Sequence, residues 1–219
     1  MPLARGGGGG YAFDVRFEPP PFRPGEGPFT ARGLVLRGYL ESIDARTPGG
    51  LAAARAELAD PAASAFFDRI FLASAYYDVG PLIQLVRVAA RREGTPLPAF
   101  VIGRSRRGAQ HDVATVYAPV LKTSSPEAMA ERLPRIFERY FQPGKSELVE
   151  VRPGRMLCRF AGLPEPALDF YVWSNEGFVG QSLELAGAKG CRVAVVSEGP
   201  DGALAGVPMR AQVVEATWS

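Results

Sequence analysis

The chain has 219 residues, of which 47% are hydrophobic and 22% are charged, a balance typical of a globular protein. Its 25 basic and 23 acidic residues give a net charge of +2, which argues against a nucleic-acid or anionic-membrane partner. No apolar run reaches the roughly 20 residues of a membrane span. Two cysteines are too few for a disulfide framework or a zinc site. We therefore expect a cytoplasmic protein with no metal site.

Residues 1–27 are predicted to be a disordered leader rich in glycine and proline. Five consecutive glycines, Gly6–Gly10, and the string EPPPFRPGEGP cannot hold a regular element. The alternation of Phe13, Val15 and Phe17 leaves a short strand open, the alternative being a flexible leader from which a few aromatic side chains dock. Residues 28–219 are predicted to form a single domain.

The next segment, residues 30–142, has the periodicity of helices. Thr30 is predicted to cap a helix whose Leu36, Leu40 and Ile43 share one face. Asp60–Pro61 has the cap and first-turn residues of a new helix. Two further helices are predicted over residues 51–59 and 81–93, with a turn between them at residues 76–78. A helical region follows over residues 99–121, interrupted near Gly103, Gly108 and Pro119. The last predicted helix of this segment begins at Ser125, and Pro134 is expected to kink or split it.

The period then changes from 3.6 to 2, which indicates strands. Met156, Cys158 and Phe160 alternate with polar or outward-facing neighbours. The predicted strands cover residues 146–152, 155–160, 191–197 and 209–217, with a turn at residues 199–202 and a helix over residues 168–187 between the two hairpins. The sequence therefore predicts an α+β fold, in which a helical first half packs on a four-stranded antiparallel sheet made of two hairpins joined by a helix.

Two segments carry a resemblance to known proteins: SPEAMAERLPRIFERYF at residues 125–141 and NEGFVGQSLELAGAKGCRVAVV at residues 175–196. With the hairpin between them, they resemble the superfamily of the 4-vinyl-reductase domain, the heme–nitric-oxide-binding domain and the Bet3-type vesicle-tethering subunits. The chain looks most similar to an uncharacterised paralogous family abundant in myxobacteria. The matching positions are Gly177, Phe178, Leu183, Glu184 and Gly187. This resemblance implies a module that binds a small molecule and forms a homodimer.

The sequence departs from both ligand-binding branches of that superfamily. The heme branch uses a proximal histidine and a Tyr-x-Ser-x-Arg string, whereas this chain has only His111 and no such string. The vinyl-reductase branch often carries a cysteine cluster, whereas only Cys158 and Cys191 occur here. The resemblance therefore implies the fold more directly than the ligand.

Several residues are candidates for a site, each with a plainer alternative. His111 could ligate heme iron or a metal, or lie on a solvated helix surface. Arg104, Arg106 and Arg107 could contact an anion, or form an exposed helix face. Trp173, Asn175 and Glu176 could line a pocket or an interface, the alternative being an exposed stripe beside Gly177 and Gly180, which pack closely on the sheet. Cys158 and Cys191 could pair or coordinate a soft ligand, the alternative being that both are small hydrophobic residues of the core.

The leading functional hypothesis is a non-enzymatic signalling or regulatory module that binds a small apolar ligand or a partner protein and needs no cofactor. Its pocket is predicted between the helices and the sheet, lined by Phe66, Phe71, Phe137, Phe160 and Phe178. The alternatives are a heme-based gas sensor that uses His111 and an enzyme of unknown reaction.

Overall fold

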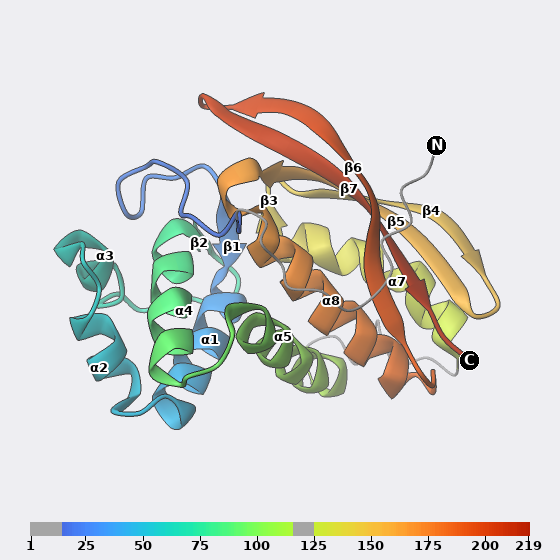
Figure 1. Ribbon diagram of the computed structural model, residues 1–219, viewed down its shortest axis with the longest axis horizontal. Helices are drawn as coiled ribbons and strands as arrows, with labels where there is room; N and C mark the ends of the chain where they lie inside the picture. Colours follow the sequence, from blue (N-terminus) through green and yellow to red (C-terminus); the bar gives the residue numbers. More distant parts are fainter. Residues whose placement is uncertain (1–14, 116–124) are drawn as a thin grey trace.

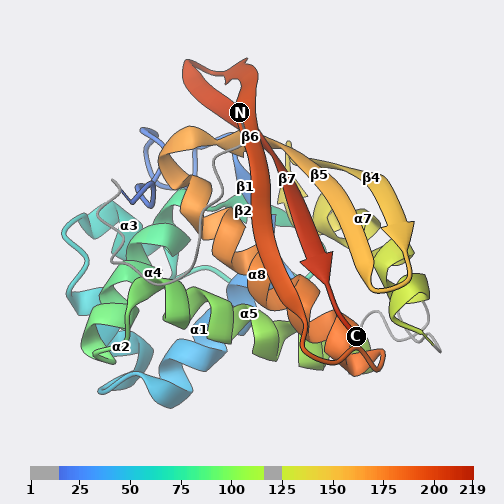
Figure 2. The same cartoon turned by 45° about the vertical axis from the view of Figure 1, so that its right-hand side comes forward.

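The computed structural model describes residues 15–115 and 125–219. Two hairpins form a four-stranded antiparallel sheet in the order β4-β5-β7-β6. The strands are β4 (Lys145–Arg152), β5 (Arg155–Pro164), β6 (Arg192–Leu204) and β7 (Val207–Thr217). Helix α8 (Leu168–Leu185) joins the two hairpins and crosses beneath the sheet (Figures 1 and 2). The structure confirms the predicted α+β fold.

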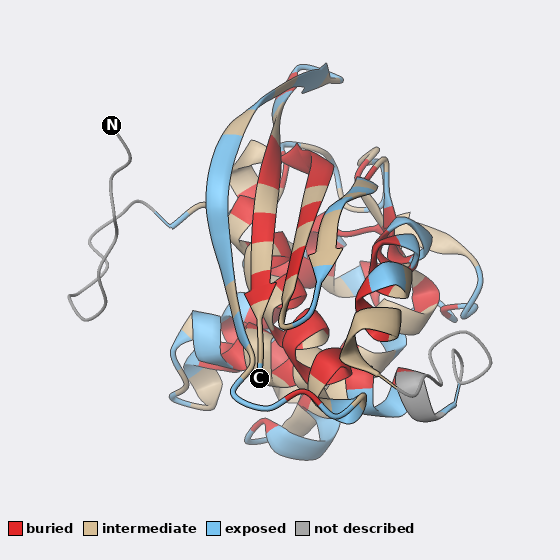
Figure 3. Cartoon of the chain, turned by 90° about the vertical axis from the view of Figure 1, so that its right-hand side faces the viewer, coloured by how far each residue is buried: buried red, intermediate tan, exposed pale blue. Residues whose placement is uncertain are grey.

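The helices gather on one side of this sheet (Figure 1). They are α1 (Gly33–Arg46), α2 (Gly50–Ala56), α3 (Pro61–Phe66), α4 (Gly80–Arg92), α5 (Leu97–Ala114) and α7 (Pro126–Tyr140), with a short 3-10 turn, η1 (Glu165–Ala167), before α8. Helix α5 packs along α8, and α7 packs on β4 and β5. Figure 3 shows buried residues alternating along the two central strands, while the edge strand β6 is largely exposed. Met156, Cys158 and Phe160 are buried on the inner face, as their alternation predicts.

A second, three-stranded sheet corrects two predictions. It consists of β2 (Tyr76–Asp78), β1 (Thr30–Arg32) and β3 (Phe141–Gln142), in that order. Thr30 pairs with Asp78 and with Gln142 instead of capping a helix. The predicted turn at residues 76–78 is likewise a strand. Strands of three residues are stabilised by partner strands far away in the chain, so no local sequence pattern predicts them.

Two helices run through the breaks that the sequence predicts. Helix α5 is continuous past Gly103 and Gly108, and the predicted part beyond residue 115 lies outside the described residues. Helix α7 continues through Pro134, which removes one backbone donor. Its buried face stabilises the helix there, because Leu133 and Phe137 belong to the hydrophobic core and Phe137 packs on Phe160 of β5.

The last hairpin is longer than predicted. The expected turn at residues 199–202 lies within β6, where the register shifts between Pro200 and Ala203. The chain reverses at Ala205 and Gly206, whose φ angles are 49° and 80°. Two-residue hairpin loops of this kind need positive φ at both positions, and an edge strand tolerates proline. Strand β6 therefore continues through the predicted turn at residues 199–202 to Leu204, and β7 begins at Val207.

The described part of the predicted leader, residues 15–27, packs against the domain. Phe17 is 1% exposed and stacks on Trp173 with ring centroids 5.4 Å apart. Arg16 donates two hydrogen bonds to the Glu198 carboxylate, at 2.6 and 2.9 Å. The Asp78 carboxylate accepts from the backbone N–H groups of Gly25 and Gly27. These residues thus contact the rest of the domain, and no strand forms over residues 15–17.

Replacing Glu198 by glutamine is expected to lower the free energy of unfolding at pH 7 by about 1 kcal/mol. The Arg16 hydrogen bonds lower the pKa of Glu198, and Gln212 and Arg210 also contact this carboxylate. A lowered carboxyl pKa gives stability that is present above the unfolded-state value of about 4.3 and is lost as the pH falls through the folded-state value. Urea unfolding of both proteins from pH 7 to pH 3.5 checks this.

The control is Glu131→Gln, because Glu131 is exposed on α7. The difference between wild type and Glu198→Gln should shrink below about pH 4. A difference that stays constant across this range would show that the charge of Glu198 does not contribute.

Candidate functional site

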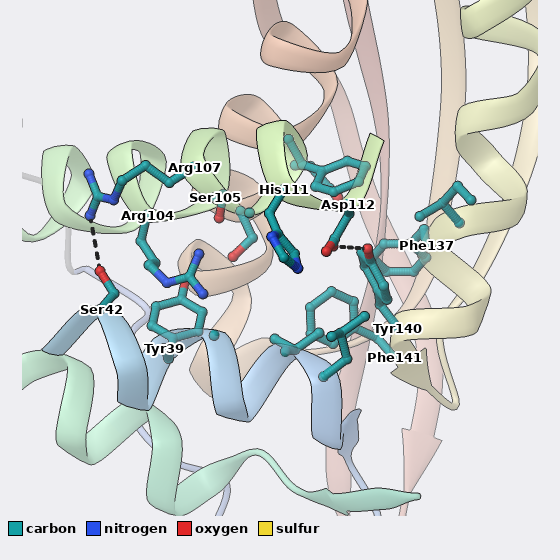
Figure 4. A pocket seen from close by; sticks show the side chains of 18 of the residues that line it. Tyr39, Ser42, Arg104, Ser105, Arg107, His111, Asp112, Phe137, Tyr140 and Phe141 are labelled. Atoms are coloured by element: carbon teal, nitrogen blue, oxygen red, sulfur yellow. Dashed lines mark hydrogen bonds between the residues drawn. The ribbon is translucent and has the colours of Figure 1, made fainter. Parts of the chain in front are cut away.

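Four helices and two strands surround a cavity of about 510 Å³. Its lining residues come from α1, α5, α7 and α8, with Phe141 from β3 and Phe160 from β5 (Figure 4). This volume lies within the roughly 300–1,000 Å³ typical of small-molecule sites. The cavity is the candidate functional site.

One end of the cavity is apolar. Phe137 packs edge-on against Phe160, with ring centroids 4.8 Å apart, and Tyr140 packs edge-on against Phe178 at 5.5 Å. The apolar lining residues are Leu34, Val35, Leu133, Ile136, Phe137, Phe141, Phe160, Phe178 and Val179. The apolar periodicity of α7 places Leu133, Ile136 and Phe137 together on the buried face of that helix. This end can hold a flat, apolar body.

The other end is polar and mainly cationic. Figure 4 shows Arg104, Arg107, Tyr39 and Ser42 at this end, with His111 between them and the aromatic residues. The charged lining residues are Arg37, Arg46, Arg104 and Arg107 against Glu41 and Asp112. Four arginines facing two carboxylates favour a ligand that carries negative charge.

His111 lies near the end of α5, and its imidazole points into the cavity (Figure 4). The residue is exposed, because the cavity opens to solvent beside it. Across residues 15–115 and 125–219, no side chain hydrogen bonds to its ring. The polar string around His111 suggests a solvated surface, but the helix turns this one side chain inward. Within the part of the chain that the structure describes, both ring nitrogens are therefore without a side-chain partner.

A buried carboxyl group stands next to His111. Asp112 accepts a hydrogen bond from the Tyr140 hydroxyl and so ties α5 to α7. Burial raises the pKa of Asp112, and the Tyr140 hydrogen bond opposes this shift. The pair closes one side of the cavity at the level of the imidazole.

Only part of the predicted pocket lines this cavity. Phe137, Phe160 and Phe178 do, but Phe66 and Phe71 do not. The last two form an aromatic cluster with Phe67 and Tyr77, beside α3. Asp60 caps α3 through the Ala62 N–H and begins this short helix where it packs on α4. The aromatic face of this segment is therefore buried away from the cavity.

The other candidates are also divided. Arg104, Arg107 and Asn175 line the cavity, whereas Arg106 forms an ion pair with Glu184 outside it. Trp173 stacks on Phe17 instead. Glu176 lies outside the cavity lining, and partial burial raises the pKa of its carboxyl group.

Sequence reasoning missed Tyr39, Ser42, Asp112, Tyr140 and Ser174 as lining residues. Tyr39 carries a usable signal, because it shares the buried face of α1 with Leu36 and Ile43. Tyr140 ends the aromatic face of α7 in the same way. Asp112 has no such signal, since its burial depends on Tyr140 from a distant helix.

The cysteines do not add a site. Both are free thiols, with Cys158 buried and Cys191 half-buried. Burial raises the pKa of Cys158 to about 12 and that of Cys191 to about 11, which leaves both protonated and unreactive at neutral pH. Among the described residues, no three histidine, cysteine or acidic side chains gather as a metal site. Within the same residues, no helix has the length and apolar character needed to cross a membrane.

The fold is shared with solved structures of H-NOX proteins. An H-NOX protein from S. oneidensis in its Fe(II)NO state has a TM-score of 0.60 at 12% identity, and the match covers 86% of this chain and 99% of that one. An oxygen-binding H-NOX domain related to soluble guanylate cyclases has a TM-score of 0.60 at 8% identity, covering 86% and 95%. No protein-family model and no curated protein sequence matches the chain.

This finding corrects the expectation that the protein needs no cofactor. Two of the H-NOX structures are in Fe(II)NO and Fe(II) ligation states. A third, with a TM-score of 0.61, comes from a study of heme distortion in the H-NOX family. Of the three branches named in the resemblance, the matched structures belong to the heme–nitric-oxide-binding one.

Proposed function

We propose that the protein is a non-enzymatic sensor domain that binds heme, with His111 as the protein ligand to the iron. The observation that carries this proposal is the position of the chain's only histidine, whose ring points into the cavity of an H-NOX fold. Imidazole is a common axial ligand of heme iron. Heme supplies an iron centre that binds a diatomic gas, as the neighbours do with NO and O₂.

The cavity suits this group in two further respects. Its aromatic end can cover an apolar macrocycle, and its arginine end can neutralise acidic substituents. The Asp112–Tyr140 hydrogen bond holds α5 and α7 together beside His111 and so limits how far the imidazole can move. The chain's own residues thus provide a ligand for the iron, an apolar wall for the macrocycle and a cationic end for its acidic substituents.

Replacing His111 by alanine is expected to abolish the Soret spectrum of a histidine-ligated heme protein. Purified wild-type protein and the variant are titrated with hemin, reduced, and exposed to NO and to O₂ while absorption spectra are recorded. Added imidazole should restore the spectrum of the variant, because it can occupy the space that the side chain leaves. The control is Gln110→Ala, an exposed neighbour on α5 outside the cavity lining.

A wild-type protein that stays colourless with hemin would contradict the proposal. So would a His111→Ala variant with the spectrum of the wild type. The homodimer and the protein partner implied by the resemblance stay predictions.

A further inference from the structure

We propose that the polar end of the cavity binds a carboxylate carried by an apolar ligand, and that Arg104 is the residue that binds it. This inference deepens the proposed function and rests on it for the identity of the ligand, since heme is one such molecule. Its structural basis is that Arg104 is buried without a carboxylate partner. The guanidinium group occupies space that is left free because Gly38 and Gly108 have no side chain.

Arg104 is only 9% exposed. Within the described ranges it forms no ion pair, and its Nε has no hydrogen-bond partner. Asp112 and Glu41 are the acidic groups whose charges reach it, but Asp112 accepts from Tyr140 and Glu41 pairs with Arg37 at 3.9 Å. A buried charge without a partner is costly, so structures normally keep one only where something compensates it.

The guanidinium group of Arg104 is held between helices α1 and α5, in a position called its seat below. It stacks over the Tyr39 ring, 5.0 Å from the ring centroid (Figure 4). A Cβ at Gly38 would overlap Arg104 Nη2, and a Cβ at Gly108 would lie 3.3 Å from Nη1. Gly38 is on α1 and Gly108 is on α5, so both helices leave room for the same group. This arrangement fixes the orientation of the planar guanidinium within the cavity wall.

Further polar groups surround this seat. The hydroxyl groups of Tyr39 and Ser174 are buried close to each other. Asn175 Nδ2 is buried and has no hydrogen-bond partner within residues 15–115 and 125–219. Arg107 also lines the cavity and donates to Ser42 at 3.4 Å. These groups can donate to an anion that Arg104 holds.

The shape of the site favours a carboxylate on an apolar body. A fixed guanidinium presents two parallel N–H donors, which match the two oxygens of a carboxylate. The opposite end of the cavity is aromatic, so a small free anion would leave it unfilled. The same chemistry is found in a porphyrin carboxylate and in a fatty acid, and the two sources can be separated by experiment.

The test compares each free acid with its ester. Metal-free protoporphyrin IX, its dimethyl ester, palmitate and methyl palmitate are titrated into wild-type protein and variants, with tryptophan fluorescence and competition as readouts. We expect the wild type to prefer the acid over the ester by roughly 10- to 100-fold, the size of a hydrogen-bonded charge contact. Arg104→Met should lose this preference through weaker binding of the acid, with ester binding unchanged.

Matched variants separate the charge from its geometry. Arg104→Lys keeps the positive charge but loses the pair of parallel N–H donors. Gly38→Ala keeps the arginine but displaces its guanidinium group. Both should retain an intermediate preference. Arg106→Met, which removes an arginine outside the cavity, should behave as the wild type. The ligand-free Arg104→Met protein should also unfold at the same or a higher temperature than the wild type, because a buried unpaired charge is gone.

The outcomes distinguish this inference from the proposed function. If hemin gives no His111-dependent spectrum but one acid binds in an Arg104-dependent way, the heme proposal fails and the carboxylate subsite stands. If hemin binds through His111 while acid and ester bind equally well to all variants, the subsite is overturned and the heme proposal stands. Failure of every acid to bind the wild type overturns the subsite.

Discussion

Replacing Gly177 by alanine is expected to destabilise the protein by about 2 kcal/mol, although alanine is the better helix former by about 1 kcal/mol. Gly177 lies on α8 where it crosses α5, and both helices approach each other closely there. A Cβ at this position would overlap the Ile102 carbonyl oxygen and lie 2.9 Å from the Ser105 Cβ. The obstacle is backbone, so the two helices must separate. Urea denaturation curves give the change in free energy of unfolding.

Gly180, three residues further along α8, is the matched control. A Cβ there would meet its nearest atoms, Arg106 Nη1 and Val193 Cγ2, at 3.7 Å, which is ordinary contact. Gly180→Ala should therefore be neutral or stabilising by up to about 1 kcal/mol. Equal effects at both positions would show that the crossing of α5 and α8 is not tightly packed.

The same crossing connects stability with the candidate site. Helix α5 carries Arg104 and His111 on the side that faces the cavity. The segment of α5 that contacts Gly177 includes Ser105, directly after Arg104. A displacement of α5 by a side chain at Gly177 would therefore move both candidate ligand contacts. The sequence predicts that this glycine packs on the sheet, but in the structure it packs against α5.

The elements that sequence reasoning located well are those with strong local signals. Asp60 and Ser125 both cap helices through their side chains, as the following prolines suggest. The hairpin of β4 and β5 follows from the turn at Pro153 and Gly154 and from alternation, and the burial of Cys158 confirms the orientation of β5. Helix α8 ends two residues before its predicted limit. Caps, alternation and apolar periodicity are properties of neighbouring residues, so a single sequence displays them.

What sequence reasoning missed depends on contacts between distant residues. Thr30 lies in a strand because Asp78 and Gln142 flank it, which its neighbours in sequence do not reveal. The cavity draws its lining from helices as far apart in the chain as α1 and α8, so aromatic content alone could not separate Phe66 and Phe71 from the residues that line it. Arg104 resembles Arg106 in sequence, yet only Arg104 is buried, because Gly38 on another helix admits it. A functional role for such residues follows from the fold that surrounds them.

Replacing Phe170 by alanine is expected to have the largest effect on stability, a loss of about 4 kcal/mol in the free energy of unfolding. Phe170 is fully buried on α8 and connects three parts of the molecule. Its ring meets Phe17 of the N-terminal segment at 5.9 Å, Tyr39 of α1 at 6.0 Å and Phe141 of β3 at 6.2 Å. Tyr39 and Phe141 both line the cavity, so the ring also supports the wall of the candidate site.

The matched control for this substitution is Phe22→Ala. Phe22 is only half-buried, and its ring meets one other, Phe29, at 6.4 Å. Its removal should cost about 1 kcal/mol, since it leaves a shallow gap that solvent can fill. Ligand affinity should fall with Phe170→Ala and stay unchanged with Phe22→Ala, because only the first loosens Tyr39 and Phe141. Similar losses of stability for both variants would show that α8 does not hold the N-terminal segment, α1 and β3 around one core.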